Sequence, residues 1–418
     1  MFSGWFESIA LGAADGGTAC MTIGCQDDFV AVRLGFPNVS ERPWRISRAI
    51  ARSSDKFNDY VTPAGDGSWT TFTVANAGAD STRIVSDPDA PVEIEVRGLN
   101  DSPLTRAARV AWTWTDWAAI RSGQPDPATG MRVLMLRALI HSDQIITTAV
   151  GQLRSFTGNA VSNQGRDVLI GGVKFNYDMV SNPNNGPLLP YGAWVANQFA
   201  PGTIFPIVQL LTQKRGITGI AVGDSHAQGT GTTDQFSGFL HFATAFLGQT
   251  HGKDLPFGMA NCGMGGLRSE EFFARFETLI QAVRPGYAVL PGWAFNDYVP
   301  DGSADCRATN VFFARLLAAL ELCSVHGILP IAMTPFPRDA EHMTPARLVP
   351  WHWLRDRILA LGASGVTVID ATSILGHREN GVFTGTYSQS LSSDGIHPND
   401  AGHYAVGQAL AAAIRAWL

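Results

Sequence analysis

The sequence predicts a chain of the α/β class in two parts: an all-β domain over residues 1–177 and a three-layer α/β/α domain over residues 214–418. The second part alternates short apolar runs with longer amphipathic stretches, which is typical of parallel strands joined by crossover helices. The first part contains short alternating runs separated by turn residues, which is typical of antiparallel strands. We therefore expect a β-sandwich, jelly-roll-like, then a connecting segment over residues 178–213, and then the α/β/α domain.

The predicted α/β/α part follows from apolar runs and helical periods. Runs of strand length lie at residues 217–222, 287–290, 328–333 and 366–369. Stretches with helical spacing lie at residues 270–283, 310–326, 345–361 and 400–416. Asn399 is placed to cap the last of these helices. Because ligand sites in open parallel sheets lie beyond the carboxyl ends of the strands, we expect the functional site at that edge.

The predicted all-β part has strand-like runs at residues 29–36, 69–75, 92–99, 110–117, 133–140 and 168–175. Alternation is clearest in VEIEVR (92–97), as in a strand with one buried face. Seven of the eleven tryptophans lie before residue 213, and Trp112 and Trp114 share one strand face. That pair is either half of a sandwich core or a platform for stacking sugars. Residues 178–206 are rich in Asn, Pro and Gly, so they bridge the domains or fold over the site.

Composition narrows the classes of partner. A net charge of −6 without a basic cluster disfavours nucleic acid, since phosphates need Lys and Arg gathered on one face. No apolar stretch approaches the about 20 residues of a membrane span, so we expect none. The N-terminus carries Glu7 and Asp15 and no basic leader, so we expect no signal peptide. This fits a cytoplasmic protein or an exported one whose leader has been removed.

No cofactor or metal is predicted. The chain has five cysteines, an odd number that favours free thiols, and it contains no Cys-x-x-Cys pair. Its ten histidines are scattered, so a metal site would need assembly by the fold alone. Neither a Gly-x-Gly-x-x-Gly turn nor a Gly-x-x-x-x-Gly-Lys loop follows the predicted strands, which argues against a bound nucleotide.

A serine after a predicted strand and a histidine near the C-terminus together suggest nucleophilic catalysis. Ser225 lies in AVGDSH (221–226), and His397 lies in DGIHP (394–398). A serine hydroxyl is a poor nucleophile at neutral pH, so it needs a histidine to accept its proton and a carboxylate to orient that histidine. Asp394 stands three residues before His397, so one short loop can hold both side chains.

Two further segments lie between these, NCGMGG (261–266) and GWAFND (292–297). With the segments around the serine and the histidine, they resemble the four sequence blocks of the SGNH (GDSL-like) hydrolases over about residues 216–418. The resemblance implies a flavodoxin-like three-layer α/β/α domain. It also implies an enzyme that cleaves carboxyl esters through an acyl-serine intermediate.

The resemblance implies a role for each matching residue. Ser225 would be the nucleophile, His397 its base, and Asp394 the carboxylate that orients the base. The oxyanion would be stabilised by the backbone N–H groups of Ser225 and Gly266 and by the side-chain amide of Asn296. Losing one such donor typically lowers the rate by ~10²- to 10³-fold.

The four blocks depart from the family pattern at specific positions. Gly292 is separated from Asn296 by three residues, where the family usually has one, so the role of Gly292 is in doubt. His226 follows the serine where the family more often has an apolar side chain, and we predict that it is not catalytic. Gly266 is chosen because it stands five positions after Asn261; the same segment also fits a helix-entry turn capped by Ser269.

The sequence thus favours a carboxyl-ester hydrolase that removes small acyl groups from its substrate, since short-chain esters and acetylated sugars recur as substrates of the enzymes it resembles. Trp293, Phe295 and Phe336 follow predicted strands and either wall the substrate pocket or simply pack. An acyltransferase would use the same residues. The alternative from another class is a carbohydrate-binding or interaction protein, with the α/β domain as scaffold and the function in the N-terminal domain.

Overall fold

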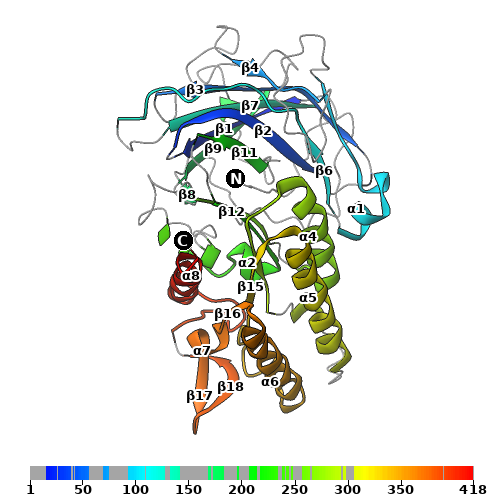
Figure 1. Cartoon of the computed structure of the whole chain (residues 1–418), viewed down its shortest axis with the longest axis vertical. Helices are drawn as coiled ribbons and strands as arrows, with labels where there is room; N and C mark the ends of the chain where they lie inside the picture. The colour runs from blue at the N-terminus through cyan, green and yellow to red at the C-terminus, as the bar shows by residue number, and fades with distance from the viewer. Residues whose placement is uncertain are drawn as a thin grey trace.

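The computed structural model describes most of the chain as two regions along its long axis, antiparallel strands in one and a helix-covered parallel sheet in the other (Figure 1). The described residues are 16–25, 27–38, 41, 43–55, 69–74, 93–108, 110–127, 132–141, 168–170, 173–182, 195–196, 207–213, 217–233, 238–240, 242–243, 246–247, 257–263, 266–292, 295–297, 306–388 and 390–417.

The second region is built on a five-stranded parallel sheet. In spatial order its strands are β13 (Phe257–Gly263), β12 (Ile217–Gly223), β14 (Tyr287–Leu290), β15 (Leu329–Met333) and β16 (Thr367–Ile369). Numbered along the chain within this sheet, the order is 2-1-3-4-5, which is the flavodoxin-like order. The chain reverses its direction of growth between β12 and β14, so a ligand site is expected beyond the carboxyl ends of these two strands.

Helices cover both faces of this sheet, so the predicted three-layer α/β/α arrangement is confirmed (Figure 1). In β14, Ala288 and Leu290 face one buried apolar cluster while Tyr287 and Val289 face the other. The first cluster is closed by α4 (Ser269–Val283), α5 (Cys306–His326) and α6 (Pro345–Ala360). The second is closed by α2 (Ser225–Gln228), α7 (Ala371–Leu375) and α8 (Asp400–Arg415).

The strands predicted in this part agree with the structure to within one residue at either end, but β13 was missed. Its sequence, FGMANCG, contains two glycines and an asparagine, which are poor strand formers. The strand forms because it pairs along its whole length with β12. A hairpin of β17 (Gly376–Glu379) and β18 (Val382–Tyr387) was also missed; it follows α7.

The first region contains two antiparallel sheets. The larger has the order β10-β9-β1-β7-β3-β4, with β5 paired to β3 and β8 paired to β9. The smaller has the order β11-β2-β6. Their bounds are β1 (Gly16–Cys25), β2 (Phe29–Asn38), β3 (Trp44–Ser54), β4 (Thr70–Thr71), β5 (Ile94–Val96), β6 (Ala111–Trp114), β7 (Arg132–His141), β8 (Val168–Ile170), β9 (Val173–Asn182), β10 (Val195–Ala196) and β11 (Ile207–Thr212).

The alternation predicted around residue 94 is present, with Ile94 and Val96 buried and Glu93 and Glu95 exposed. The run 168–175 is split into β8 and β9, and the long strands β1 and β3 were not predicted. A one-turn-and-a-half helix, α1 (Pro103–Ala108), interrupts the strands of this region. Whether the two sheets form a jelly roll stays a prediction.

The connection predicted over residues 178–213 is wrong as a continuous linker. Strand β9 crosses residue 177 and ends at Asn182, and β11 pairs with β2. Three consecutive residues at the start of β11, from Ile207 to Gln209, are buried. The side chain of Gln209 accepts a hydrogen bond from Arg33 of β2. This apolar run therefore gains more by completing the small sheet than by crossing solvent.

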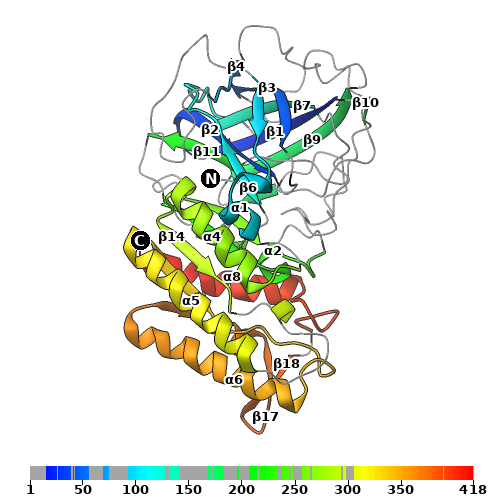
Figure 2. The ribbon, with the colours of Figure 1, turned by 90° about the vertical axis from the view of Figure 1, so that its right-hand side faces the viewer.

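The two regions share one apolar cluster, which runs from Phe29, Leu34 and Ile46 of the antiparallel sheets to Phe272 and Phe276 of α4. Helix α1 lies against α4 in both views of the molecule (Figure 2). The N-terminal region is thus packed onto a helix that begins near the carboxyl ends of the parallel strands.

Among the described residues, one segment has the length and apolar composition of a membrane span, Ala308–His326 within α5, and one such segment is weak evidence. It buries Phe312, Leu316 and Cys323 at helical spacing against the parallel sheet.

Three cysteines, Cys25, Cys262 and Cys323, are free and buried. Burial raises the pKa of the Cys262 and Cys323 thiols to about 12, so both stay protonated at neutral pH.

Close approach of two strands predicts a strict need for glycine at position 219. Gly219 of β12 lies opposite Tyr287 of β14, and a Cβ at residue 219 would fall within the buried Tyr287 ring. We expect Gly219→Ala to lower the free energy of unfolding by roughly 1–3 kcal/mol, through overpacking. Urea denaturation measures this. Gly362→Ala is the matched control, since no atom lies within 4 Å of a Cβ there; equal stability of the two variants would contradict the prediction.

Candidate active site

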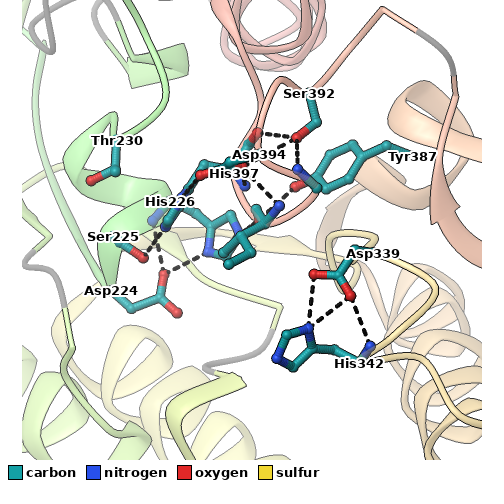
Figure 3. Close-up of polar contacts among 12 residues, drawn as sticks. Asp224, Ser225, His226, Thr230, Asp339, His342, Tyr387, Ser392, Asp394 and His397 are labelled. Carbon is teal, nitrogen blue, oxygen red and sulfur yellow. Dashed lines mark hydrogen bonds and ion pairs between the residues drawn. The ribbon is translucent and has the colours of Figure 1, made fainter.

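The serine turn stands at the carboxyl end of β12, between the strand and α2 (Figure 3). Asp224 caps α2 by accepting a hydrogen bond from the His226 backbone N–H at 3.0 Å. Gly223 has a φ of 152° and lies so close to Ala227 that a Cβ would come within 2.8 Å of the Ala227 methyl group. This sharp turn leaves the Ser225 side chain partly exposed at the sheet edge.

The structure brings Ser225, His397 and Asp394 together, although Ser225 is 172 residues from His397 in sequence. His397 Nε2 lies 2.9 Å from Ser225 Oγ, and His397 Nδ1 lies 2.8 Å from Asp394 Oδ2 (Figure 3). If Nδ1 carries its proton toward the carboxylate, Nε2 is free to accept the serine proton. The arrangement can therefore convert the hydroxyl into a nucleophile.

The loop that carries His397 is held by hydrogen bonds within itself. Asp394 Oδ1 accepts from the backbone N–H groups of Ile396 at 2.8 Å and His397 at 2.7 Å. Ser392 Oγ accepts from Gly395 N–H at 2.9 Å and donates to the His397 carbonyl at 2.6 Å. The spacing of three residues between the carboxylate and the imidazole is what allows Asp394 to bond both the backbone and the ring.

The electrostatics of the loop suit a neutral base beside an ionised carboxylate. Burial raises the pKa of Asp394, but the N–H groups of His397 and Ile396 outweigh it and bring the pKa down to about 2. Burial and the charge of His226 lower the pKa of His397, against the opposing effect of Asp394. His397 is thus ready to accept a proton at neutral pH.

The segments around NCGMGG (261–266) and GWAFND (292–297) are joined to each other by hydrogen bonds. Asn296 Nδ2 donates to the Leu267 carbonyl at 3.0 Å, and Asp297 Oδ1 accepts from the Ser269 backbone N–H at 2.9 Å. The first bond uses one amide hydrogen of Asn296 and leaves the other for a ligand. Ser269 is the first residue of α4 and does not cap it; its hydroxyl accepts from Arg315 instead.

Gly266 lies in the turn between β13 and α4, exposed and with a φ of 79°. This left-handed conformation favours glycine, and no atom lies within 4 Å of the position of a Cβ. Gly263 and Gly265 are further glycines of this block that could approach a substrate; Gly265 lies outside the described residues, and Gly263 is buried against α2, where a Cβ would lie 2.6 Å from that of Ala227. Of these two described glycines, Gly266 is the one with an exposed backbone.

Gly292 has a packing role. A Cβ at residue 292 would collide with the backbone of Met333 and Thr334 at the end of the neighbouring strand β15.

Sequence reasoning assigned Asn261 no role other than the position from which Gly266 is counted. Its Nδ2 donates to the Ala227 carbonyl at 2.8 Å and its Oδ1 accepts from Gly263 N–H at 2.9 Å, which fixes β13 to the serine turn.

The aromatic residues predicted to line a pocket are placed differently from one another. Phe295 is half-buried beneath the Arg338 guanidinium, whose carbon lies 4.0 Å from the ring centroid. Phe336 packs edge-on to the His226 ring at 5.0 Å between centroids, and both line a cavity with Asp224. Trp293 lies outside the described residues. Arg338, which no sequence motif indicated, is therefore a cation beside the segment that carries Asn296.

His403 is a second buried histidine near the serine turn, and its partners are backbone groups. His403 Nδ1 accepts from Phe239 N–H at 3.1 Å, and its Nε2 donates to the Thr230 carbonyl at 3.1 Å. Burial lowers the pKa of His403 to about 3, so it is a neutral structural link between α8 and the segment after α2.

Among the described residues no group of three or more His, Cys, Asp or Glu side chains could hold a metal ion.

No family model matches the chain, and no curated protein matches it. Solved structures similar to it include a GDSL-like lipase from Bacteroides thetaiotaomicron, with 17% identity and a TM-score of 0.38, over 48% of this chain and 89% of that one. An acetylxylan esterase variant from Geobacillus stearothermophilus has 18% identity and a TM-score of 0.39, over 48% and 95%. A G-D-S-L family protein from Desulfitobacterium hafniense has 19% and 0.37, over 47% and 99%. Each of these matches spans about half of this chain.

The environment of His397 predicts its titration. Because burial and the charge of His226 lower its pKa, we expect the midpoint of the His397 ring below the usual 6.5. Asp394 raises this pKa, so Asp394→Asn should lower the midpoint further. Histidine-selective NMR measures both, with His397→Gln to assign the signal. A wild-type midpoint above 6.5, or an upward shift in Asp394→Asn, would contradict the prediction.

Proposed function

We propose that this protein is a serine carboxyl-ester hydrolase. The observation that carries the proposal is the chain of two hydrogen bonds from Asp394 through His397 to Ser225, at 2.8 and 2.9 Å. Such a chain needs three side chains in fixed orientations, and Ser225 comes from a loop that is 172 residues before His397 in sequence. The low pKa of Asp394 supports an ionised carboxylate behind the base.

In the proposed reaction, Ser225 Oγ attacks the ester carbonyl while its proton passes to His397 Nε2. The tetrahedral oxyanion is stabilised by the backbone N–H groups of Ser225 and Gly266 and by the free amide hydrogen of Asn296. His397 then gives its proton to the departing alcohol, leaving an acyl-serine. A water molecule, activated by His397 in the same way, releases the acid and restores Ser225.

The finer assignment is a preference for short acyl groups, acetyl esters of carbohydrates among them. The sequence resemblance suggests this class. Phe295 and Phe336 would wall the pocket, with Trp293 as a third wall. One of the similar solved structures is named an acetyl xylan esterase. We further propose that residues 1–177 form a jelly-roll-like accessory domain that supports α4 through the shared apolar cluster.

The carbohydrate-binding alternative depends on tryptophans of the N-terminal region. Trp112 and Trp114 are stacked at 6.0 Å between ring centroids, but Trp114 is only 6% exposed and lies in the core cluster. Its ring is therefore occupied by packing, which supports the core interpretation of this pair. An acyltransferase would need an acceptor alcohol in place of water in the last step, and the same residues would serve it.

Removal of the proposed nucleophile tests the reaction. We expect Ser225→Ala to lower kcat/KM for p-nitrophenyl acetate by at least ~10³-fold, because the acyl-serine cannot form. Kinetics on p-nitrophenyl esters of increasing acyl length measure this and the chain-length preference together. Ser324→Ala, on the exposed face of α5, is the control and should keep wild-type rates. Turnover in Ser225→Ala equal to the control would refute the proposal.

Removal of an oxyanion donor should act on kcat more than on KM, because the donor serves the transition state. We expect Asn296→Ala to lower kcat by ~10²- to 10³-fold. Asn296 also bonds the Leu267 carbonyl, so the melting temperature of the variant is measured beside its kinetics. A loss of kcat below ~10-fold in a fully folded variant would remove Asn296 from the proposed oxyanion site.

A further inference from the structure

We propose that His226 is a positioning residue that holds the loop carrying His397 against the serine turn. The inference rests on the proposed function and adds a residue that the four sequence blocks do not assign. It goes against the apolar preference expected at this position. His226 is 9% exposed and stands next to Ser225, on the first turn of α2.

The imidazole of His226 bridges the two loops of the site. Its Nδ1 lies 3.0 Å from Asp224 Oδ1, and its Nε2 lies 2.9 Å from the Ile396 carbonyl oxygen (Figure 3). Ile396 immediately precedes His397 and is 170 residues away from His226 in sequence. One side chain thus connects the capping carboxylate of the serine turn to the backbone of the loop that carries the base.

Both partners of the His226 ring are acceptors. A carbonyl oxygen has no proton to give, so Nε2 must donate to Ile396. Burial raises the pKa of Asp224, but the charge of His226 and the hydrogen bonds from it outweigh this and lower the pKa, so the carboxylate accepts from Nδ1. The bridge therefore uses an N–H on each ring nitrogen. Asp224 is 2% exposed, so its carboxylate depends on hydrogen bonds from within the protein, and the ring supplies one of them.

The Ile396 carbonyl is held from a second side. Tyr387 at the end of β18 donates its hydroxyl proton to the same oxygen at 3.0 Å. Phe336 packs edge-on to the His226 ring and limits its rotation. The carbonyl oxygen is therefore fixed between two donors from different parts of the domain. Because His397 is the next residue, fixing this carbonyl also restrains the backbone that carries the His397 ring.

The His226 bridge also places a second imidazole beside the base. The rings of His226 and His397 are 5.3 Å apart between centroids. The charged groups around the pair are Asp224 on the serine turn, Asp394 on the terminal loop and Arg338 after β15, and Asp224 and Asp394 act in the opposite direction to His226 on the pKa of His397. Removal of the His226 ring should therefore raise the pKa of His397.

A matched pair of variants separates the two halves of the bridge. The amide nitrogen of Gln stands at the position of Nε2 and can donate to Ile396, whereas the amide nitrogen of Asn stands at the position of Nδ1 and can donate only to Asp224. We expect kcat of His226→Gln within ~10-fold of wild type and kcat of His226→Asn lower by ~10²-fold, since a misplaced catalytic group costs that much. KM should change little in either.

Stability distinguishes positioning from a merely structural role. His226→Gln leaves the buried Asp224 carboxylate without its ring partner, so its melting temperature should be the lower of the two. The predicted order of activity is thus opposite to the predicted order of stability. Both variants remove the His226 ring, which lowers the pKa of His397, so both should move the acid limb of kcat/KM to higher pH. If kcat follows stability instead, or if His226→Asn is as active as His226→Gln, the positioning role is overturned.

Amide hydrogen exchange tests the same bridge without any turnover. The N–H groups of Gly395, Ile396 and His397 are all hydrogen bonded within the loop, so their exchange reports how firmly it is held. Exchange of residues 390–400 should rise in His226→Asn and stay near wild type in His226→Gln. His377→Gln, on the exposed hairpin, is the control. Equal exchange in all variants overturns the inference even in an active esterase, whereas absence of ester turnover in wild type refutes the proposed function alone.

Discussion

The hydrogen bond between Ser225 Oγ and His397 Nε2 is the constraint on which the rest of the site depends, because its two atoms come from loops far apart in the chain. Its length of 2.9 Å requires the serine turn and the terminal loop to be placed to within a fraction of an ångström. Several contacts serve that placement. Asp400 at the start of α8 accepts from Thr233 N–H at 2.8 Å, and His403 binds both Thr230 and Phe239. The first turn of α8 is thus fastened to the segment that follows Ser225.

The parallel sheet supplies the second level of this placement. Because the strand order reverses between β12 and β14, the segments after these strands lie side by side, and they carry Ser225 and Asn296. Asp297 and Asn296 then fix the start of α4, which is the helix on which the N-terminal region packs. The antiparallel sheets are therefore mechanically connected to the Gly266 turn through α4. This gives the N-terminal region a structural reason to influence the site even if it never contacts a substrate.

Sequence reasoning predicted the features that depend on short, local stretches of residues. The strands 217–222 and 287–290 were predicted because buried parallel strands are continuous apolar runs, and Ser225, Asp394 and His397 were predicted because a nucleophile, an orienting carboxylate and a base are recognisable residue types. Strand β13 was missed because pairing with β12 overrides its two glycines. Strand β11 was taken for part of a connection because its partner β2 lies far away in sequence. The Ile396 carbonyl and Arg338 could not be predicted, since a backbone acceptor and a lone cation carry no motif.

The central claim is that Ser225 is activated by His397, and a fluorophosphonate probe tests it most directly. The probe reacts with a serine only when a base removes its proton and an oxyanion site receives the phosphoryl oxygen. Mass spectrometry of the digested protein would locate the adduct in wild type and in His397→Gln. The account predicts one adduct, on Ser225, that forms in wild type and not in His397→Gln. An adduct on another serine, or labelling of Ser225 at the same rate in both proteins, would contradict it.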